Sequence, residues 1–258
     1  MKKLVTILMI LCLVIISGCS ANEDKTVDSI DDEVLKAGTL VVGISADYPP
    51  FESLDLSNNL VGYDVDMAEA LASKITTETG EKYAVEFVQM DFSTIISALQ
   101  TGQVDLGIAA FSYDPERQCL FTEPYYLSAQ VICVLADSGI NSLSDLNGKT
   151  VAAGDGTVGY DAASQIEGVT MVTPGDYLQQ FELLKNNQID AVVCDQKVAE
   201  NFVSAGSALK ILDEKLAEDN LCITVKTGNT FTLEALNKAV KDFVSSGESD
   251  QLKEKWGL

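Results

Sequence analysis

One segment, from Asp91 to Tyr126, constrains the fold of this chain more than any other. In its first part, Ile95, Ile96 and Leu99 recur at helical spacing, and Gly102 then ends the predicted helix. A tight turn and a short apolar run follow, as expected of a strand that is covered on both faces. Alternation of this kind, which the neighbouring segments continue, is typical of a parallel sheet with covering helices.

A polar loop follows the predicted buried strand, Val104 to Ala110, and carries a single arginine, Arg117. Open α/β sheets place their ligand sites at the carboxyl ends of strands. The planar guanidinium of arginine donates two parallel hydrogen bonds, which match a carboxylate. The loop therefore predicts recognition of a small anion or zwitterion. The alternative is that Arg117 only pairs at the surface with Asp114 or Glu116.

The same pattern occurs twice in the chain. Leu99 to Ala110 reads LQTGQVDLGIAA, and Leu184 to Asp195 reads LKNNQIDAVVCD. In both segments a helix end, a polar turn, Gln, a β-branched residue and Asp precede a buried strand, so Asp105 aligns with Asp190. Two copies suggest two similar α/β lobes that offer strand ends to a shared cleft. The alternative is that unrelated α/β units resemble one another.

The rest of the chain continues the alternation. Strands are expected at Leu40–Ser45, Tyr83–Val88, Val131–Leu135, Thr150–Ala153, Val169–Val172 and Ile189–Val193, with helices at Asp64–Ile75 and Leu178–Lys185. The C-terminal part predicts one strand and two helices. The first of these helices carries an apolar stripe that should pack against the core.

The N-terminus has the features of a secretory signal. Lys2 and Lys3 precede an apolar run, Leu4 to Ile16, which is too short to span a bilayer comfortably as a mature anchor. The ISGC sequence that ends at Cys19 resembles the lipobox of bacterial lipoproteins, in which the cysteine becomes the lipidated first residue. We therefore predict a lipoprotein signal peptide at residues 1–18. The alternative is an ordinary cleaved signal with an incidental cysteine.

The chain is strongly acidic, with a formal net charge of −22. This charge argues against binding of nucleic acid or anionic lipid through the surface field. Residues 19–34 are polar and acidic, so they predict a flexible tether.

The sequence contains no histidine. Nucleophile triads with an imidazole base and zinc sites with histidine ligands are therefore excluded. Beyond Cys12 and Cys19 the cysteines are Cys119, Cys133, Cys194 and Cys222. None lies in a C-x-x-C pair, and we expect no metal and no cofactor. A Cys133–Cys222 disulfide is one hypothesis, and four free thiols are the other.

Several motifs, taken in their order along the chain, resemble a known family. They are PPFE (Pro49–Glu52), GYDVDMAEALA (Gly62–Ala72), ALQTGQVDL, PER (Pro115–Arg117) followed by FTEPYY, GKTVAAGDGT, IDAVVCD and KEKWG. Together they resemble the bacterial extracellular solute-binding proteins of ABC transporters for polar amino acids, family 3, over nearly the whole mature chain. The glutamine- and histidine-binding proteins belong to this family.

The resemblance implies a type II periplasmic-binding-protein-like fold, with two α/β lobes joined by two hinge crossings. Each lobe would be a mainly parallel sheet flanked by helices, with lobe 1 at 35–126 and 222–258 and lobe 2 at 127–221. The protein would be a monomer, anchored through the lipid on Cys19 to the extracytoplasmic face of the cell membrane. It would close around a polar amino acid and deliver it to the permease of an ABC importer, without being an enzyme.

The resemblance also implies roles for individual residues. Arg117 would hold the α-carboxylate of the ligand, helped by Ser112 and the backbone at Ala110, and Asp195 would take the α-ammonium. Each charge of a zwitterion loses hydration in a cleft and needs an opposite charge there. With these two residues on different lobes, the ligand would bridge the lobes and favour closure.

Three further residues complete the predicted site. Thr157, at a helix start, would offer backbone N–H groups to the carboxylate, and Tyr48 and Phe92 would flank the ligand with their rings. The alternatives are structural: Thr157 and Asp195 as helix caps, and the two aromatic residues as packing.

The amino acid itself is not determined by the motifs. At the positions that read the ligand side chain the sequence has Ser45, Gly154 and Cys194, which match no relative of known preference. Asp155 would either meet a cationic side chain or face solvent. The segment between Arg117 and Phe121 is also shorter than the family leads us to expect.

Two other functions are compatible with the same fold. One is an extracellular amino-acid sensor or accessory binding protein. The other is an enzyme like cyclohexadienyl dehydratase, which would need a glutamate able to act as an acid inside the pocket, together with a lysine.

Overall fold

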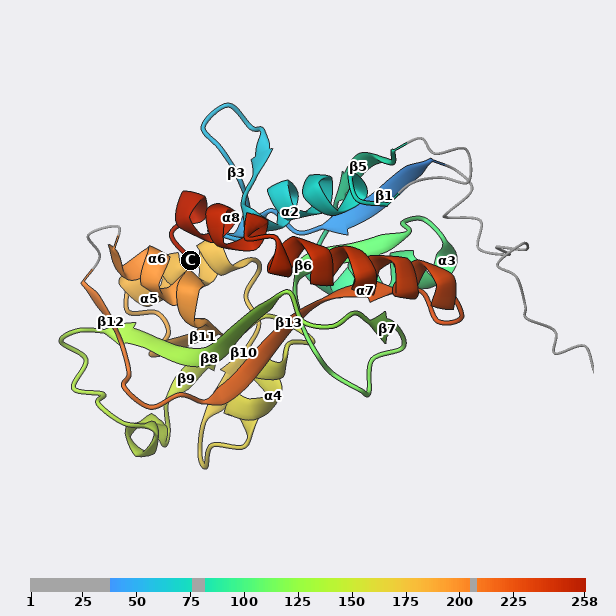
Figure 1. The fold of residues 1–258 in the computed structure, drawn as a ribbon. Helices are drawn as coiled ribbons and strands as arrows, with labels where there is room; N and C mark the ends of the chain where they lie inside the picture. The colour runs from blue at the N-terminus through green and yellow to red at the C-terminus, as the bar shows by residue number, and fades with distance from the viewer. Residues whose placement is uncertain (1–37, 76–81, 205–207) are drawn as a thin grey trace, which may run out of the picture. The chain divides into compact units, whose positions relative to one another are not determined.

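The structure is a computed structural model, and it describes residues 38–75, 82–204 and 208–258 (Figure 1). The predicted signal peptide, Cys19 and the predicted tether lie outside these ranges. Within them, no helix is both long enough and apolar enough to cross a membrane.

Strands and helices alternate along the chain, as the sequence predicts. The strands are β1 (Thr39–Ile44), β2 (Asp47–Tyr48), β3 (Glu52–Leu54), β4 (Leu60–Val61), β5 (Ala84–Gln89), β6 (Leu106–Ser112), β7 (Leu120–Phe121), β8 (Tyr126–Leu135), β9 (Thr150–Ala152), β10 (Thr170–Val172), β11 (Ala191–Asp195), β12 (Leu209–Ile211) and β13 (Ala217–Val225). The helices are α2 (Tyr63–Ala72), α3 (Phe92–Thr101), the 3-10 helix η1 (Leu143–Leu146), α4 (Val158–Ser164), α5 (Tyr177–Lys185), α6 (Gln196–Ser204), α7 (Thr230–Ser245) and α8 (Glu248–Trp256).

The main sheet joins two groups of parallel strands through antiparallel ones. Its order is β10-β9-β11-β8-β13-β6-β1-β5. Strand β1 is parallel to β5 and β6, and β9 is parallel to β10 and β11. Strands β8 and β13 are antiparallel to each other and to their outer neighbours. The result is the two-lobed mixed α/β fold that was predicted, while the lobe boundaries at 35–126, 127–221 and 222–258 stay predictions.

The two predicted helix–turn–strand units have matching hydrogen bonds. In the first unit, Asp105 donates its backbone N–H to the Val41 carbonyl (2.7 Å) and accepts the Val41 N–H on Oδ2 (2.8 Å). In the second, Asp190 donates to the Thr150 carbonyl (2.9 Å) and accepts the Thr150 N–H on Oδ2 (2.9 Å). Each aspartate thus ties the start of its strand, β6 or β11, to the neighbouring parallel strand.

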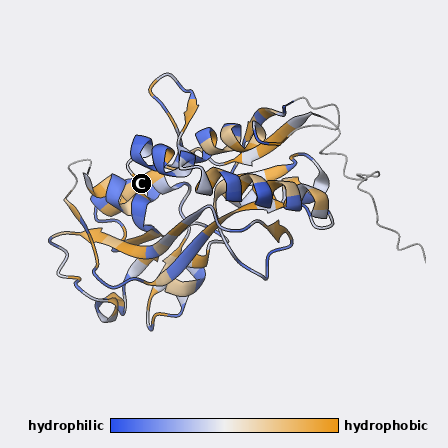
Figure 2. Cartoon of the chain, in the orientation of Figure 1, coloured by the Kyte–Doolittle hydropathy of each residue, from blue (hydrophilic) through white to orange (hydrophobic). Residues whose placement is uncertain are grey.

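Helix α2 packs against α7 and α8, two consecutive helices that lie far from it in the sequence (Figure 1). Helix α7 alternates hydrophilic and hydrophobic colour along its length in Figure 2, and its buried residues include Leu236, Val240 and Phe243, as the predicted stripe requires. Helix α2 begins after Gly62, whose φ is 144°. A Cβ at this position would collide with the carbonyl oxygen of Phe51. Glycine therefore allows the close turn that places the first turn of α2 in the core.

The four described cysteines are free thiols. The hypothesis of a Cys133–Cys222 disulfide is therefore wrong. Cys133, on β8, lies opposite Val192 and Ile211, whereas Cys222, on β13, lies opposite Phe111. The strand register thus places the two residues in different parts of the sheet.

Candidate functional site

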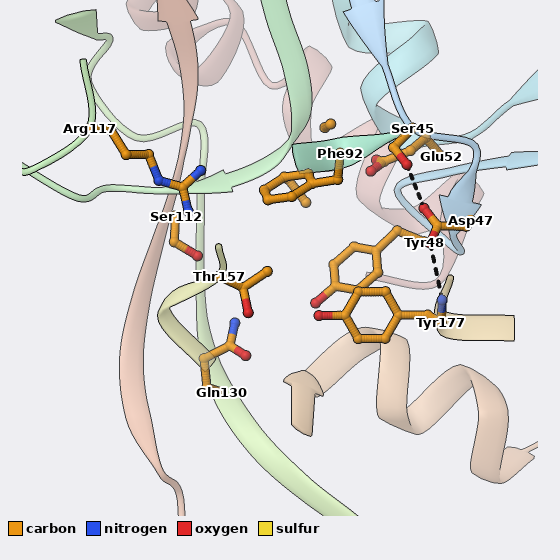
Figure 3. Close-up of a pocket in the computed structure, with 12 residues that line it drawn as sticks. Ser45, Asp47, Tyr48, Glu52, Phe92, Ser112, Arg117, Gln130, Thr157 and Tyr177 are labelled. Carbon is orange, nitrogen blue, oxygen red and sulfur yellow. Dashed lines mark hydrogen bonds between the residues drawn. The ribbon is translucent and has the colours of Figure 1, made fainter. Parts of the chain in front are cut away.

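A small cavity, here called the inner cavity, lies among the residues at the strand ends (Figure 3). It is lined by Ser45, Asp47, Tyr48, Glu52, Phe92, Ala109, Ala110, Ser112, Arg117, Gln130, Thr157 and Tyr177. Its volume is about 30 Å³, room for about two waters on a scale where one needs about 10–15 Å³. All but one of the predicted ligand-binding residues line it, and the exception is Asp195.

A larger cavity, here called the outer cavity, adjoins the inner one and has a volume of about 460 Å³. The two share Ser45, Asp47, Phe92 and Tyr177. The other residues of the outer cavity are Asp91, Ser93, Gly154, Asp155, Thr173, Gly175, Asp176, Gln179 and Gln180. Among the residues that the structure describes, this lining includes four aspartates and no lysine or arginine.

Arg117 reaches the inner cavity from the loop after β6. Its guanidinium lies 5.5 Å from the ring centroid of Phe92 and 5.3 Å from that of Phe111. Nη2 donates to the carbonyl of Gly156 (2.6 Å), and Nε contacts Asp114 at 3.4 Å. Arg117 thus lies in the cavity wall and also makes a long contact with Asp114, the pairing that was the predicted alternative.

Ser112, at the end of β6, is held by a buried carboxylate. Asp219 Oδ2 accepts from Ser112 Oγ (2.9 Å) and from Gln130 Nε2 (2.6 Å). Burial raises the pKa of Asp219, although both hydrogen bonds oppose the rise. Sequence reasoning missed Gln130 and Asp219, because no local motif marks either of them.

Ala110 has a left-handed backbone, with φ of 45°, which is uncommon for a residue other than glycine. Its N–H donates to Asp64 Oδ2 (2.9 Å), which also accepts from the hydroxyl of Tyr125 (2.8 Å). A strained backbone conformation persists only where surrounding contacts fix it. Here the hydrogen bond to Asp64, in the first turn of α2, fixes it. The backbone conformation of Ala110, which lines the inner cavity, is therefore fixed by the fold.

Two carboxyl groups in this region are buried, and neither forms an ion pair within the described residues. Asp64 is 0% exposed and Glu52 is 1% exposed. Burial raises the pKa of Asp64 to about 6. Burial, with Asp64 nearby, holds the pKa of Glu52 well above its usual range. Glu52 lines the inner cavity, and the PPFE motif was the signal that could have identified it.

Asp195, the last residue of β11, is buried next to Tyr48. Its Oδ1 accepts from Ser128 Oγ (2.5 Å) and from the N–H of Lys197 (3.1 Å), so it also caps α6. Its Oδ2 has no hydrogen-bond partner among the described residues. Burial, with Asp219 adding to it, raises the pKa of Asp195 to about 7. Within the described part of the chain, Asp195 is thus a buried acceptor that pairs with no cation.

Besides the bond from Ser112 to Asp219, hydrogen bonds among the described residues join the predicted first lobe to the predicted second around the inner cavity. One is the Arg117–Gly156 hydrogen bond already described. Tyr48 Oη accepts from the N–H of Asp195 (2.8 Å). Asp47 Oδ2 accepts from the N–H of Tyr177 (3.1 Å) (Figure 3). An amino acid is larger than the inner cavity, so these contacts must separate before one enters.

Aromatic rings form one wall of the site (Figure 3). The centroids of Tyr48 and Tyr177 are 4.7 Å apart, and Phe92 stacks on Phe111 at 4.6 Å. Phe92 therefore lines the cavity, as predicted, and also packs against Phe111, which was the alternative. Tyr177 was not predicted; it begins α5, one residue before the expected helix at Leu178–Lys185.

Thr157 also has both the predicted position and the alternative structural role, and the three predicted selector positions lie in different places. Thr157 lines the inner cavity and is the N-cap of α4, accepting from the N–H of Tyr160 (3.1 Å). Ser45 and Gly154 line the outer cavity, whereas Cys194 is fully buried and lines neither.

Comparison with known proteins gives one consistent result. The model of "Bacterial extracellular solute-binding proteins, family 3" matches residues 40–258. The arginine-binding extracellular protein ArtP of Bacillus subtilis is 34% identical over 225 residues, which cover 84% of this chain and 85% of ArtP. These similar proteins are transport-associated binding proteins rather than enzymes, in agreement with the sequence-based prediction.

Solved structures agree on the fold. A mutant of ArgBP from T. maritima has a TM-score of 0.80 and 35% identity, and the match covers 88% of this chain and 99% of that one. An ancestral arginine-binding protein bound to glutamine has a TM-score of 0.75 and 37% identity, with coverage of 85% and 97%.

Proposed function

This chain belongs to the bacterial extracellular solute-binding proteins of family 3, and we propose that it captures a polar amino acid between its two lobes for delivery to an ABC importer. The observation that carries this proposal is the pair of opposite charges at the site. Arg117 lies in the wall of the inner cavity, and Asp195 is a buried acceptor without a cation.

The proposed binding mode uses this pair. The α-carboxylate of the ligand replaces the Gly156 carbonyl as the partner of Arg117, with Ser112 and the backbone at Ala110 beside it. The α-ammonium supplies the donor that Asp195 Oδ2 lacks. Because each partner comes from a different predicted lobe, the closed form is favoured when both ends of the ligand are satisfied.

Thr157, Tyr48 and Phe92 complete this mode. Thr157 is placed at the loop whose Gly156 carbonyl meets Arg117, so its backbone lies near the proposed carboxylate position. The rings of Tyr48 and Phe92 supply apolar faces that exclude water and favour nearby positive charge.

A dehydratase-like enzyme is the weaker candidate. Glu52 is a cavity carboxyl group with a raised pKa, which such chemistry needs. No lysine, however, lines either of the two cavities. The similar proteins are also named for binding rather than catalysis.

A thermal-shift screen tests the proposed function. The purified protein is partly unfolded, dialysed to remove any bound amino acid, refolded, and then heated with each of the twenty amino acids, cystine, ornithine or prephenate. A ligand of the folded state raises the melting temperature by mass action. A rise with one or a few amino acids is expected. A response to prephenate alone would transfer the proposal to the enzyme.

We also propose that the protein is a monomer, anchored by lipid on Cys19 to the extracytoplasmic face of the membrane after removal of residues 1–18. The ISGC sequence supports this proposal. Cys19→Ser should move the protein from the membrane fraction to the soluble fraction. Membrane attachment that persists in this variant would argue for another anchor.

A further inference from the structure

We propose that the outer cavity receives the positively charged end of the ligand side chain, so that the ligand is an amino acid with a terminal guanidinium or ammonium group. This inference rests on the proposed binding of an amino acid at the inner cavity. The names of the relatives do not decide it, because an ancestral arginine-binding protein is also solved with glutamine.

The first observation is the one-sided charge of the cavity lining. Asp47, Asp91, Asp155 and Asp176 all line the outer cavity, and no described lysine or arginine does. Asp155 and Asp176 come from the predicted second lobe, and Asp47 and Asp91 from the predicted first. Carboxylates of one sign around a shared hollow attract an opposite charge. A cationic group there would therefore face acceptors from both lobes.

The second observation is an acceptor without a donor. Gln180, on α5, lines the outer cavity and is 0% exposed. Its Nε2 donates to the carbonyl of Ala153 (3.3 Å), but its Oε1 has no hydrogen-bond partner among the described residues. A buried acceptor without a partner is costly, and a ligand N–H donor would satisfy it.

The two cavities are also arranged for a long side chain. They share Phe92 and Tyr177, so a chain that runs from the inner to the outer cavity passes aromatic rings. Ring faces favour cations. The outer cavity, at about 460 Å³, reaches the range of about 300–1,000 Å³ that is typical of small-molecule sites.

A metal ion fits the outer cavity less well than an organic cation. Among the described residues, no three or more of His, Cys, Asp or Glu stand close enough to hold a metal. Spread carboxylates with an amide oxygen suit a group that donates several hydrogen bonds in different directions, as a guanidinium does.

The test compares arginine with citrulline, which has a neutral ureido group in place of the guanidinium. Isothermal titration of the detergent-solubilised full chain should give an arginine affinity at least about tenfold higher than that for citrulline. Equal affinities, or preference for neutral amino acids such as glutamine, would overturn this inference and leave the proposed function standing. Binding of no amino acid would remove the proposed function itself.

Asp155→Asn tests whether the preference for arginine arises at the outer cavity. Asp155 is exposed, and its side chain has no hydrogen bond within the described residues that the substitution would remove. The substitution should weaken arginine about threefold to tenfold and leave citrulline within about twofold. Asp213→Asn, which removes an exposed carboxylate outside both cavities, should change neither ligand. An equal loss for both ligands, or no loss for arginine, would contradict the role of Asp155.

Discussion

The two helix–turn–strand units differ at their last residue. In Leu99–Ala110 the unit ends on a left-handed alanine whose N–H is held by Asp64. In Leu184–Asp195 it ends on a carboxylate with one oxygen that lacks a donor. Their turns, by contrast, carry the same aspartate, which makes the same pair of hydrogen bonds to the neighbouring strand.

This comparison separates what the scaffold requires from what the ligand requires. The turn aspartate is the same in both units because each parallel strand must start in register with its neighbour. The last residue of each unit borders the site rather than the core. It can therefore present its backbone to the site in the first unit and a carboxylate in the second. One anionic and one cationic partner then stand on opposite predicted lobes, with Arg117 following the first unit and Asp195 closing the second.

The largest expected effect comes from removing the cation that follows the first unit. Arg117→Ala should weaken amino-acid binding by about 100-fold or more, because it leaves the ligand carboxylate without its charged partner. Titration calorimetry measures the loss, and circular dichroism checks that the fold is kept. Arg117→Lys is the matched control, because it keeps the charge but loses the two parallel hydrogen bonds. Its amino-acid affinity should lie between those of the wild type and the alanine variant. Near-normal affinity in the alanine variant would remove the central role of Arg117.

The second effect removes the charge that closes the second unit. Asp195→Asn should weaken amino acids about tenfold more than it weakens analogues that lack the amino group, since only the former place an ammonium at this carboxylate. The two ligand sets are compared by calorimetry in the same variant. If both lose affinity equally, the ammonium assignment is wrong and Asp195 acts mainly as the cap of α6.

The third effect concerns what the units share. Asp105→Ala and Asp190→Ala should each lower the free energy of unfolding by about 1–3 kcal/mol, because each leaves a strand N–H without its acceptor. Urea denaturation of the two variants gives the comparison. Asp190 also lies 3.2 Å from Lys149 Nζ, so salt should reduce the loss in the Asp190 variant by at most about 1 kcal/mol. A large loss in one variant and none in the other would show that the two turns are not equivalent.

The smallest effect is on the pH dependence of stability. Burial raises the pKa of Asp64 to about 6 and that of Asp195 to about 7, from an ordinary value of 3.8. The folded protein therefore holds protons that the unfolded chain has released, and its free energy of unfolding should fall as the pH rises from about 4 to about 7.

Two variants separate the contributions of Asp195 and Asp64 to this pH dependence. Asp195→Asn should flatten the slope up to about pH 7, and Asp64→Asn only up to about pH 6. Urea denaturation across the range measures both. Stability that rises with pH in the wild type would contradict the raised pKa of these carboxyl groups. Because an ammonium favours the ionised form of Asp195, amino-acid binding below about pH 7 should also release a proton, which calorimetry in two buffers detects.

Much of the site was predictable because its signals are local. The order of strands and helices, the two matching units, and the arginine in the loop after β6 depend on residues that are near one another in the chain. Apolar periodicity and turn residues report such features directly. The family motifs added the other five predicted residues that line the inner cavity.

The sequence by itself therefore determined the alternating α/β units and the charged residues that end or follow them. Only the tertiary structure decided their surroundings. It brings Asp219 to Ser112, places Asp195 behind Tyr48, and gathers four aspartates from separate segments around the outer cavity. These neighbours are far apart in sequence, and the order and register of the strands bring them together. Burial and unmet hydrogen bonds, which distinguish a ligand site from a surface, follow from that packing and cannot be read from spacing along the chain.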